Sequence, residues 1–177
     1  MSAREKLKAR LGSYWKLEIA NVLIVPACMI FLPLSYGTSI GWISYICFVP
    51  MCGLLLIGGL YWRAKLAQLN GDKTALPHML KHAHIWQTPL LITTLLACAL
   101  CLAGWGIPNL ARSMSDKLVA TIAAVLAALE YVNYYKRQVQ HFDHVADFKK
   151  LLQGKGFRPS QMAVDLRRWR EKRGADS

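Results

Sequence analysis

Apolar residues gather in four long runs along the chain, and short polar segments separate the runs. The runs cover roughly residues 17–36, 42–62, 86–106 and 118–135. Each has about the length of predominantly apolar sequence that a helix needs to cross a bilayer. Tyr and Trp mark most of the run ends, as expected for rings that prefer the headgroup layer. The pattern predicts an all-α integral membrane protein, built as a bundle of four transmembrane helices.

The fourth helix is predicted to extend beyond the membrane, because no Pro or Gly interrupts the chain from Leu118 to Gln153. Along this helix, steps of four and three residues define one continuous seam, a spacing that keeps a seam facing a partner. The seam consists of Ala123, Ala127, Glu130, Tyr134, Arg137, His141, His144, Phe148 and Leu151. We therefore expect a membrane domain over residues 1–153, with a long cytoplasmic extension of its fourth helix.

Small residues predict where the helices touch. Ala120, Ala124 and Ala128 recur at every fourth position of the fourth run, and Gly53, Gly58 and Gly59 lie in the second run. In lipid, helices associate through close backbone approach, so such residues mark contacts. At the N-terminus, residues 1–16 predict a short basic amphipathic helix that continues into a retained first span rather than a cleaved signal peptide.

Charge then orients the predicted bundle. The 177 residues are 54% hydrophobic and only 18% charged, yet the net charge is +12. Twenty of the 22 Lys and Arg residues lie before the first run, between the second and third runs, or after the fourth, and only Arg112 and Lys117 lie in the other loops. The positive-inside rule therefore places both termini in the cytoplasm. We expect a multi-pass protein of the bacterial inner membrane.

The tail over residues 154–177 is predicted as a basic amphipathic surface helix. Met162, Leu166 and Trp169 form its apolar stripe, and six Lys or Arg residues surround them. A helix of this kind suits an anionic membrane surface, so lipid headgroups are the expected partner. A protein partner is an alternative. Nucleic-acid binding is not expected, because no recognition motif accompanies the charge.

A candidate polar cluster lies where the fourth run ends. It comprises Glu130, Asn133, Tyr134, Arg137, His141 and His144. Ionisable groups in membrane helices indicate function, and Glu130 is the only acidic residue of its run. It can carry a proton, coordinate a cation or pair with Arg137. Glu18, at the start of the first run, is expected in the headgroup layer.

Histidines offer a metal site as an alternative to plain interfacial packing. His78 and His82 are four residues apart, and His141 and His144 are three apart, so each pair can share a helix face. If the two pairs met, they would form a site for a divalent metal such as zinc, with Asp143 or Asp147 nearby. Because both spacings are common by chance, the prediction is that no cofactor is bound, with zinc as the alternative.

Five cysteines lie inside the predicted spans, and Cys98 and Cys101 have the C-x-x-C spacing of thiol redox motifs. The size and topology resemble the bacterial four-helix disulfide-generating quinone reductases. That resemblance implies cysteine pairs at or in the outer loops. Here the loops over residues 37–41 and 107–117 contain no cysteine. We therefore interpret the thiols as small packing residues.

Two classes of function follow from these patterns. No nucleotide-binding motif or catalytic triad spacing is present. The favoured class is a non-enzymatic accessory or scaffold protein of the inner membrane. It would bind partners, or a second copy through its fourth helix. The alternative is a membrane-embedded transporter or metal-dependent enzyme, with a polar site at the cytoplasmic membrane boundary.

Overall fold

The computed structural model describes residues 3–138 and 158–175, and the regular elements in these residues are all helices. They are α1 (Ala3–Ser35), α2 (Trp42–Leu69), α3 (Ala75–Gly106), α4 (Met114–Tyr135) and α6 (Gln161–Ala175). The first four are each long and apolar enough to cross a membrane. The prediction of an all-helical chain with four such helices is confirmed for the described residues.

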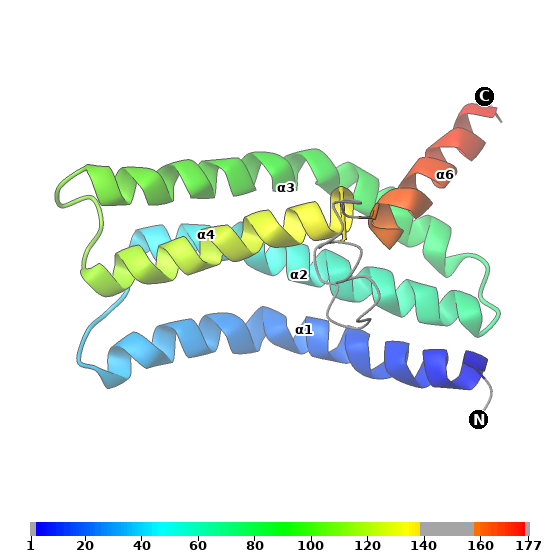
Figure 1. Ribbon diagram of the computed structural model, residues 1–177, viewed down its shortest axis with the longest axis horizontal. Helices are drawn as coiled ribbons and strands as arrows, with labels where there is room; N and C mark the ends of the chain where they lie inside the picture. Colours follow the sequence, from blue (N-terminus) through cyan, green and yellow to red (C-terminus); the bar gives the residue numbers. More distant parts are fainter. Residues whose placement is uncertain (1–2, 139–157, 176–177) are drawn as a thin grey trace, which may run out of the picture.

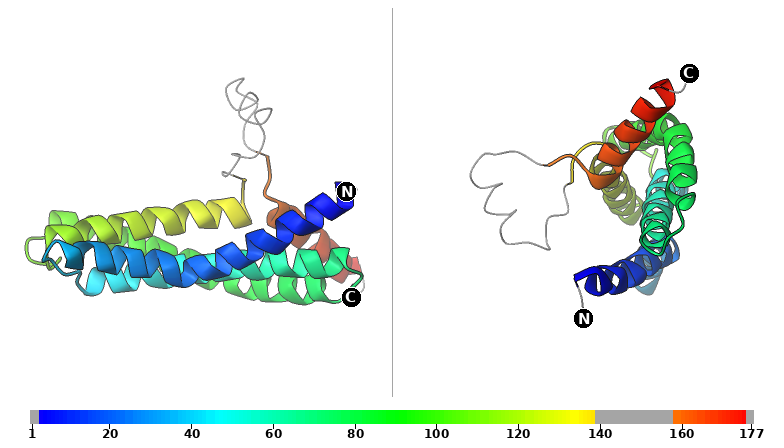
Figure 2. Two further views of the ribbon diagram at one scale, coloured as in Figure 1. Left: turned by 90° about the horizontal axis from the view of Figure 1, so that it is seen from below. Right: turned by 90° about the vertical axis from the view of Figure 1, so that its right-hand side faces the viewer.

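The central helix of the bundle is α2, which packs against α1, α3 and α4. Helices α3 and α4 also pack against each other, whereas α1 packs extensively only against α2 (Figure 1). In the most apolar stretch of α1 only 11% of residues are buried, against 61% in α2. Seen end-on in Figure 2, α1, α2 and α3 follow a curve, with α4 against its inner side. Helix α1 does not pack extensively on α4, so the bundle is not closed between these two helices.

Close approach of α2 and α4 depends on the predicted small residues. The buried alanines of α4 are Ala120, Ala123, Ala124 and Ala127. On α2, a Cβ atom added to Gly58 would lie 2.1 Å from the Tyr134 hydroxyl, and one added to Gly59 would lie 2.7 Å from Ile19. Real Cβ atoms do not lie this close to other atoms, so a methyl group at Gly58 would displace Tyr134 of α4, and one at Gly59 would displace Ile19 of α1. The predicted seam of α4 is buried as far as Tyr134.

Helix α4 ends at Tyr135, so the prediction of an uninterrupted helix to Gln153 is wrong at the described residues that follow. The backbone of Lys136 leaves helical geometry, and Arg137 forms an isolated antiparallel bridge with Pro159. This pairing satisfies backbone groups that a longer helix would have satisfied internally. The absence of Pro and Gly permitted a longer helix but did not require one.

The apolar stripe of the C-terminal helix packs against the bundle. Met162 and Leu166 of α6 are buried, and the ring of Trp169 lies 5.7 Å from that of His84 on α3. The cationic side chains of α6 remain exposed: Arg167, Arg168, Arg170, Lys172 and Arg173. What α6 offers to a membrane surface is therefore its basic face rather than its apolar stripe.

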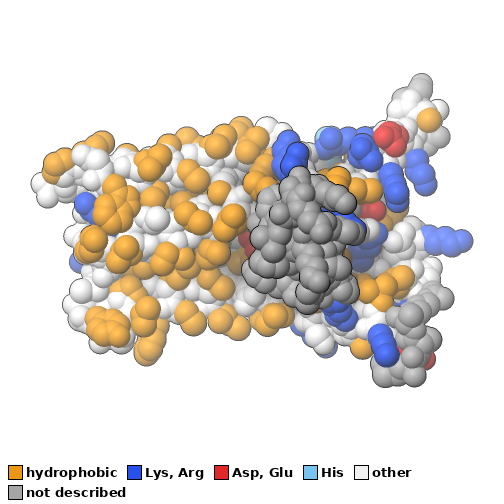
Figure 3. All heavy atoms as spheres, in the orientation of Figure 1, with side chains coloured by type: hydrophobic (Ala, Val, Ile, Leu, Met, Phe, Trp, Pro, Cys, Tyr) orange, Lys and Arg blue, Asp and Glu red, His pale blue; other side chains and the backbone are white. Residues whose placement is uncertain are grey.

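Both termini, the α2–α3 loop and α6 lie at one end of the bundle, which we call the basic end (Figure 1). Figure 3 shows most of the visible Lys and Arg side chains gathered there, while apolar side chains predominate over the described length of the bundle beyond it. The α1–α2 and α3–α4 turns lie at the opposite end. Four antiparallel helices thus return the chain to the side from which it began.

The α2–α3 turn is closed by Asp72, which lies shortly before the start of α3. One carboxylate oxygen of Asp72 accepts hydrogen bonds from the Thr74 hydroxyl (2.7 Å), the Thr74 N–H (2.8 Å) and the Ala75 N–H (3.2 Å). These bonds, led by the one from the Thr74 side chain, hold the pKa of Asp72 below its usual value. A negative charge here also suits the N-terminus of α3.

Candidate functional site

The predicted polar cluster is only partly assembled by the described residues. Glu130, Asn133 and Tyr134 lie in the last turns of α4, and each is less than a tenth exposed. The Asn133 amide donates to the Glu130 carboxylate at 3.4 Å. Arg137 is exposed beyond the end of α4. His141 and His144, like the rest of residues 139–157, lie outside the described residues.

The metal site predicted from paired histidines is not present in the described part of the chain. There, no group of three or more His, Cys, Asp or Glu side chains is placed to hold a metal ion. His78 and His82 lie exposed on the first turns of α3. The five cysteines are all free, and Cys47 and Cys101 are buried in the core, as expected for packing residues.

Glu18 of α1 is a member of the cluster that sequence reasoning placed elsewhere. It was expected in the headgroup layer, but it is only 6% exposed, and its carboxylate faces the hydroxyl groups of Tyr14 and Tyr134. Glu130 is also close enough to act electrostatically on both tyrosines. Two carboxylates from α1 and α4 therefore converge on one pair of phenols. We call these residues, together with Asn133, the Tyr134 cluster.

Tyr134 lies at the centre of this cluster because α2 has no side chain in its way. Its ring tip rests on Gly58, and the side chain is 3% exposed. The hydroxyl faces the Glu18 carboxylate without reaching hydrogen-bond geometry, and the described residues offer it no other partner. A buried hydroxyl without a partner costs roughly 1–3 kcal/mol. Such a group is uncommon in a packed protein and calls for an explanation.

A cavity of about 180 Å³ lies beside the Tyr134 cluster at the basic end. Four helices contribute to its walls: the first turns of α1, the end of α2, the end of α4 and the start of α6. The residues that line it include Leu7, Arg10, Tyr14, Trp62, Tyr134 and Gln161. The indole N–H of Trp62 is also buried without a hydrogen-bond partner. Two unpaired donors thus belong to residues around one cavity.

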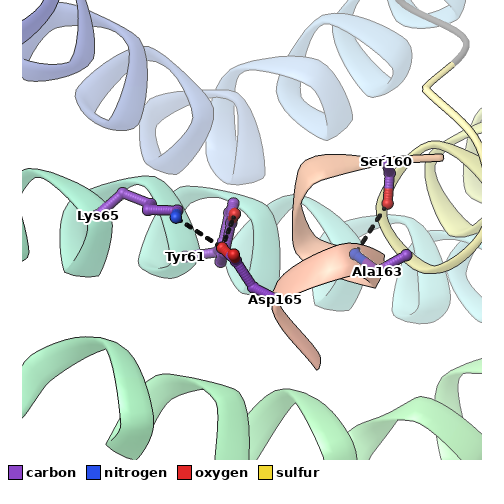
Figure 4. A network of polar contacts seen from close by, with 5 residues as sticks. All are labelled: Tyr61, Lys65, Ser160, Ala163 and Asp165. Carbon is purple, nitrogen blue, oxygen red and sulfur yellow. Dashed lines mark hydrogen bonds and ion pairs between the residues drawn. The ribbon is translucent and has the colours of Figure 1, made fainter. Parts of the chain in front are cut away.

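Helix α6 is held over this cavity by a polar network that the sequence did not reveal (Figure 4). Asp165 accepts a hydrogen bond from the Tyr61 hydroxyl and forms an ion pair with the Lys65 amine, each at 2.7 Å. The Ser160 hydroxyl accepts from the Ala163 N–H at 3.1 Å and donates to the Tyr134 carbonyl. Asp165 lies three residues after Met162, and its local sequence gives no sign of the contact with Tyr61, which is 104 residues away in the chain.

A second buried polar cluster lies at the opposite end of the bundle. Asp116, at the start of α4, is fully buried and accepts hydrogen bonds from the Ser44 hydroxyl (2.6 Å), the Ser44 N–H (3.3 Å) and the Arg112 N–H (3.0 Å). Ser113 caps α4 by accepting from the Asp116 N–H at 3.1 Å. A Cβ atom on Gly41 would lie 2.4 Å from the carboxylate. We call these five residues the Asp116 cluster.

Comparisons with known proteins do not add to this description. No family model matches the chain, and neither a curated protein nor a solved structure matches it. The geometry of the bundle and its two polar clusters is therefore the basis for a proposed function.

Proposed function

We propose that this chain is a non-enzymatic, multi-pass accessory or scaffold protein of the bacterial inner membrane, with its basic end in the cytoplasm. The gathering of Lys and Arg at the end that carries both termini supports this orientation, because positively charged loops stay on the cytoplasmic side. Apart from the short turns, the opposite end carries no described structure. Binding is therefore expected within the membrane and at the basic end.

The observation that carries the proposal is the incomplete closure of the bundle. Helix α1 is held by α2 almost alone, and α4 turns a large apolar stripe outward. The stripe consists of Leu118, Ile122, Val125, Leu129 and Val132. Its residues are separated by steps of four and three, which is the spacing that packs along another helix. A partner helix, or α4 of a second copy, would complete the packing.

Photo-crosslinking in native membranes tests the scaffold. A photoreactive residue replaces Val125 on the outward stripe of α4, and the matched control replaces Leu96, which is similarly exposed on α3. The two positions lie at similar depth, because the Cys98 thiol contacts the Ala124 carbonyl at 3.9 Å. We expect a discrete protein adduct, or a crosslinked dimer, from position 125 only. Lipid adducts alone from both positions would contradict the scaffold.

A second candidate is a transporter, or an enzyme with its site at the cytoplasmic boundary. The convergence of Glu18 and Glu130 on Tyr14 and Tyr134 favours it, since paired carboxylates in membrane helices commonly move protons or cations. Proton or solute flux into vesicles that contain the purified protein would reveal this activity. Flux that is lost in folded Glu130→Gln protein would favour the transporter over the scaffold.

The metal-dependent version of this candidate needs the histidines outside the described residues. Elemental analysis of the purified protein, repeated after His141 and His144 are both changed to Ala, addresses it. A stoichiometric metal that disappears with the double change would support a metal site. No stoichiometric metal in the parent protein would rule that version out.

A further inference from the structure

An open groove of about 240 Å³ lies between α3 and α6 at the basic end. It holds several times the volume that one water molecule takes in the liquid, roughly 30 Å³. The first two turns of α3 form one wall, and α6 forms the other. The lining residues are Pro77, His78, Lys81, Trp169 and Arg173. Among the described residues, no acidic side chain lines this groove, so its charge is positive.

Contacts between α6 and α3 give the groove its shape. The Trp169 ring lies 5.7 Å from the His84 ring, and the Arg170 guanidinium contacts a nitrogen of the same histidine at 3.1 Å. The Arg173 guanidinium in turn lies 5.1 Å from the centre of the Trp169 ring. This cation–π contact keeps the Arg173 charge at the groove. Part of the cost of ordering the side chain is therefore met before a ligand arrives.

The groove has the side chains that bind a phosphate. Lys81 and Arg173 approach from different helices, and both are exposed. An arginine can bind a phosphate through two parallel N–H groups, and the His78 ring can add a further donor. The carboxylate of Asp72 acts electrostatically on His78, but hydrogen bonds from the N-cap and first residue of α3 occupy it.

An exposed apolar track leads from the groove along α3. After Lys81, steps of four, seven and four residues reach Ile85, Ile92 and Leu96, so these side chains share one face of the helix. The three apolar residues are each more than half exposed. Trp86, beside Ile85, is also exposed and is suited to the headgroup layer. A soluble anion has no use for such a track, whereas a phospholipid joins a phosphate to acyl chains.

We propose that the groove binds the phosphate of an anionic phospholipid from the cytoplasmic leaflet. The phosphate lies between Lys81 and Arg173, His78 donates to one of its oxygens, and an acyl chain follows Ile85 and Ile92 along α3. Basic pockets beside membrane helices on the cytoplasmic side suit such headgroups. The site rests on the proposed membrane location and orientation of the bundle, but it does not need a partner on α4.

Native mass spectrometry of the delipidated full-length protein tests the lipid preference. The protein receives equal amounts of phosphatidylglycerol and phosphatidylcholine with identical acyl chains, so that only the headgroups differ. The choline cation would face a cationic groove. We therefore expect one phosphatidylglycerol to be retained about 10-fold better than phosphatidylcholine, which corresponds to one charge-assisted contact. Equal retention of the two lipids would overturn the site.

Two double variants with the same change in charge locate the binding. Lys81→Gln with Arg173→Gln removes two cations of the groove, whereas Lys73→Gln with Arg168→Gln removes two exposed cations that do not line it. The first should lose about 10-fold in retention of phosphatidylglycerol, and the second should change little. Thermal unfolding verifies that both variants stay folded. Equal losses in folded proteins would show a diffuse attraction to the basic end and would contradict a defined site.

A competition experiment separates the lipid from a soluble anion. Millimolar inorganic phosphate, added at constant ionic strength, should leave the bound phosphatidylglycerol in place, because the acyl chains add apolar contacts that free phosphate lacks. Displacement of the lipid by phosphate would identify a site for a soluble anion, and the lipid assignment would be wrong.

An alkaline wash of native membranes separates failure of the site from failure of the proposed location. Protein that stays in the washed membranes but shows no lipid preference would overturn the site and leave the membrane location in place. Protein that the wash releases would contradict the location, and the lipid site with it.

Discussion

The two ends of this bundle each bury acidic side chains, but they treat the hydrogen bonds around them differently. At the end opposite the basic one, Asp116 receives hydrogen bonds from the hydroxyl and N–H groups of its neighbours. At the basic end, the Tyr134 hydroxyl and the Trp62 indole remain unpaired although both are buried. The burial of polar groups is similar, and only the Asp116 cluster is complete in itself.

The difference separates a cluster whose buried polar groups are all paired from one in which two buried groups are not. In the Asp116 cluster, the hydrogen bonds from Ser44 to Asp116 hold the starts of α2 and α4 together. An unsaturated cluster lowers stability until something supplies the missing acceptors. The two clusters also differ in what surrounds them. Only short turns lie at the end that contains the Asp116 cluster, whereas α6 packs over the basic end.

The largest effect is expected when Asp116 is removed. In Asp116→Ala, the Ser44 hydroxyl, the Ser44 N–H and the Arg112 N–H lose their acceptor in a buried site, so the free energy of unfolding should fall by roughly 3 kcal/mol. Unfolding in detergent under a denaturant titration measures the change. Asp116→Asn keeps one acceptor oxygen and should lose less. An Asp116→Ala protein as stable as the parent would show that the cluster is not structural.

The next largest effect should follow from Gly58→Ala. The new methyl group would lie 2.1 Å from the Tyr134 hydroxyl, so either the ring moves or α2 and α4 separate, at a cost of about 1–3 kcal/mol. The same unfolding assay measures the loss. Tyr134→Leu shortens the side chain and should restore part of the stability lost in Gly58→Ala. If the double variant is as unstable as the sum of the two changes, the contact is not the cause.

Much of this packing follows from local sequence signals. Run lengths predict the four helices because a span must satisfy all its backbone groups internally. Alanines and glycines predict the α2–α4 contact because only small residues allow close approach. The end of α4 was mispredicted, since it depends on pairing between Arg137 and Pro159, and a local pattern does not contain that long-range contact.

The candidate site was predicted less completely. Glu130, Asn133 and Tyr134 stood out because polar residues are rare at the end of an apolar run. Glu18 was placed in the headgroup layer, because an acid near Lys16 looks solvated until α4 brings Tyr134 against it. The Asp165 network joins helices that are distant in the chain, and no sequence signal marks Lys65 as its partner.

A smaller, local effect is expected at the docking of α6. In Asp165→Asn, the ion pair with Lys65 is lost and the hydrogen bond from Tyr61 weakens, so docking should lose about 1–3 kcal/mol while the four long helices stay folded. Limited proteolysis after Arg167 or Arg168 measures the undocking as faster cleavage. The control is Glu171→Gln, whose side chain is exposed on α6. Equal cleavage rates in both variants would show that Asp165 does not hold the helix.

A still smaller effect separates the two clusters most directly. Tyr134→Phe removes a hydroxyl that has no hydrogen-bond partner among the described residues, so the stability of the protein should change by less than about 1 kcal/mol. Ser44→Ala removes a hydroxyl that bonds to Asp116 and should destabilise the protein more. Thermal unfolding of both variants in lipid-free detergent measures the difference. A larger loss in Tyr134→Phe than in Ser44→Ala would contradict this difference between the clusters.

The smallest effect concerns Asp72, whose exposed carboxylate caps α3 at the basic end. Because hydrogen bonds from Thr74 and Ala75 favour the charged form, the pKa of Asp72 in the folded protein lies below its ordinary value. The cap therefore contributes fully above the unfolded pKa and is lost as the pH falls through the lower folded pKa. The amide signals of Thr74 and Ala75, followed by NMR in micelles, should titrate with a midpoint below the ordinary pKa of an aspartate. In Asp72→Asn that titration should vanish, and the signals of the Asp116 cluster should stay unchanged in both proteins.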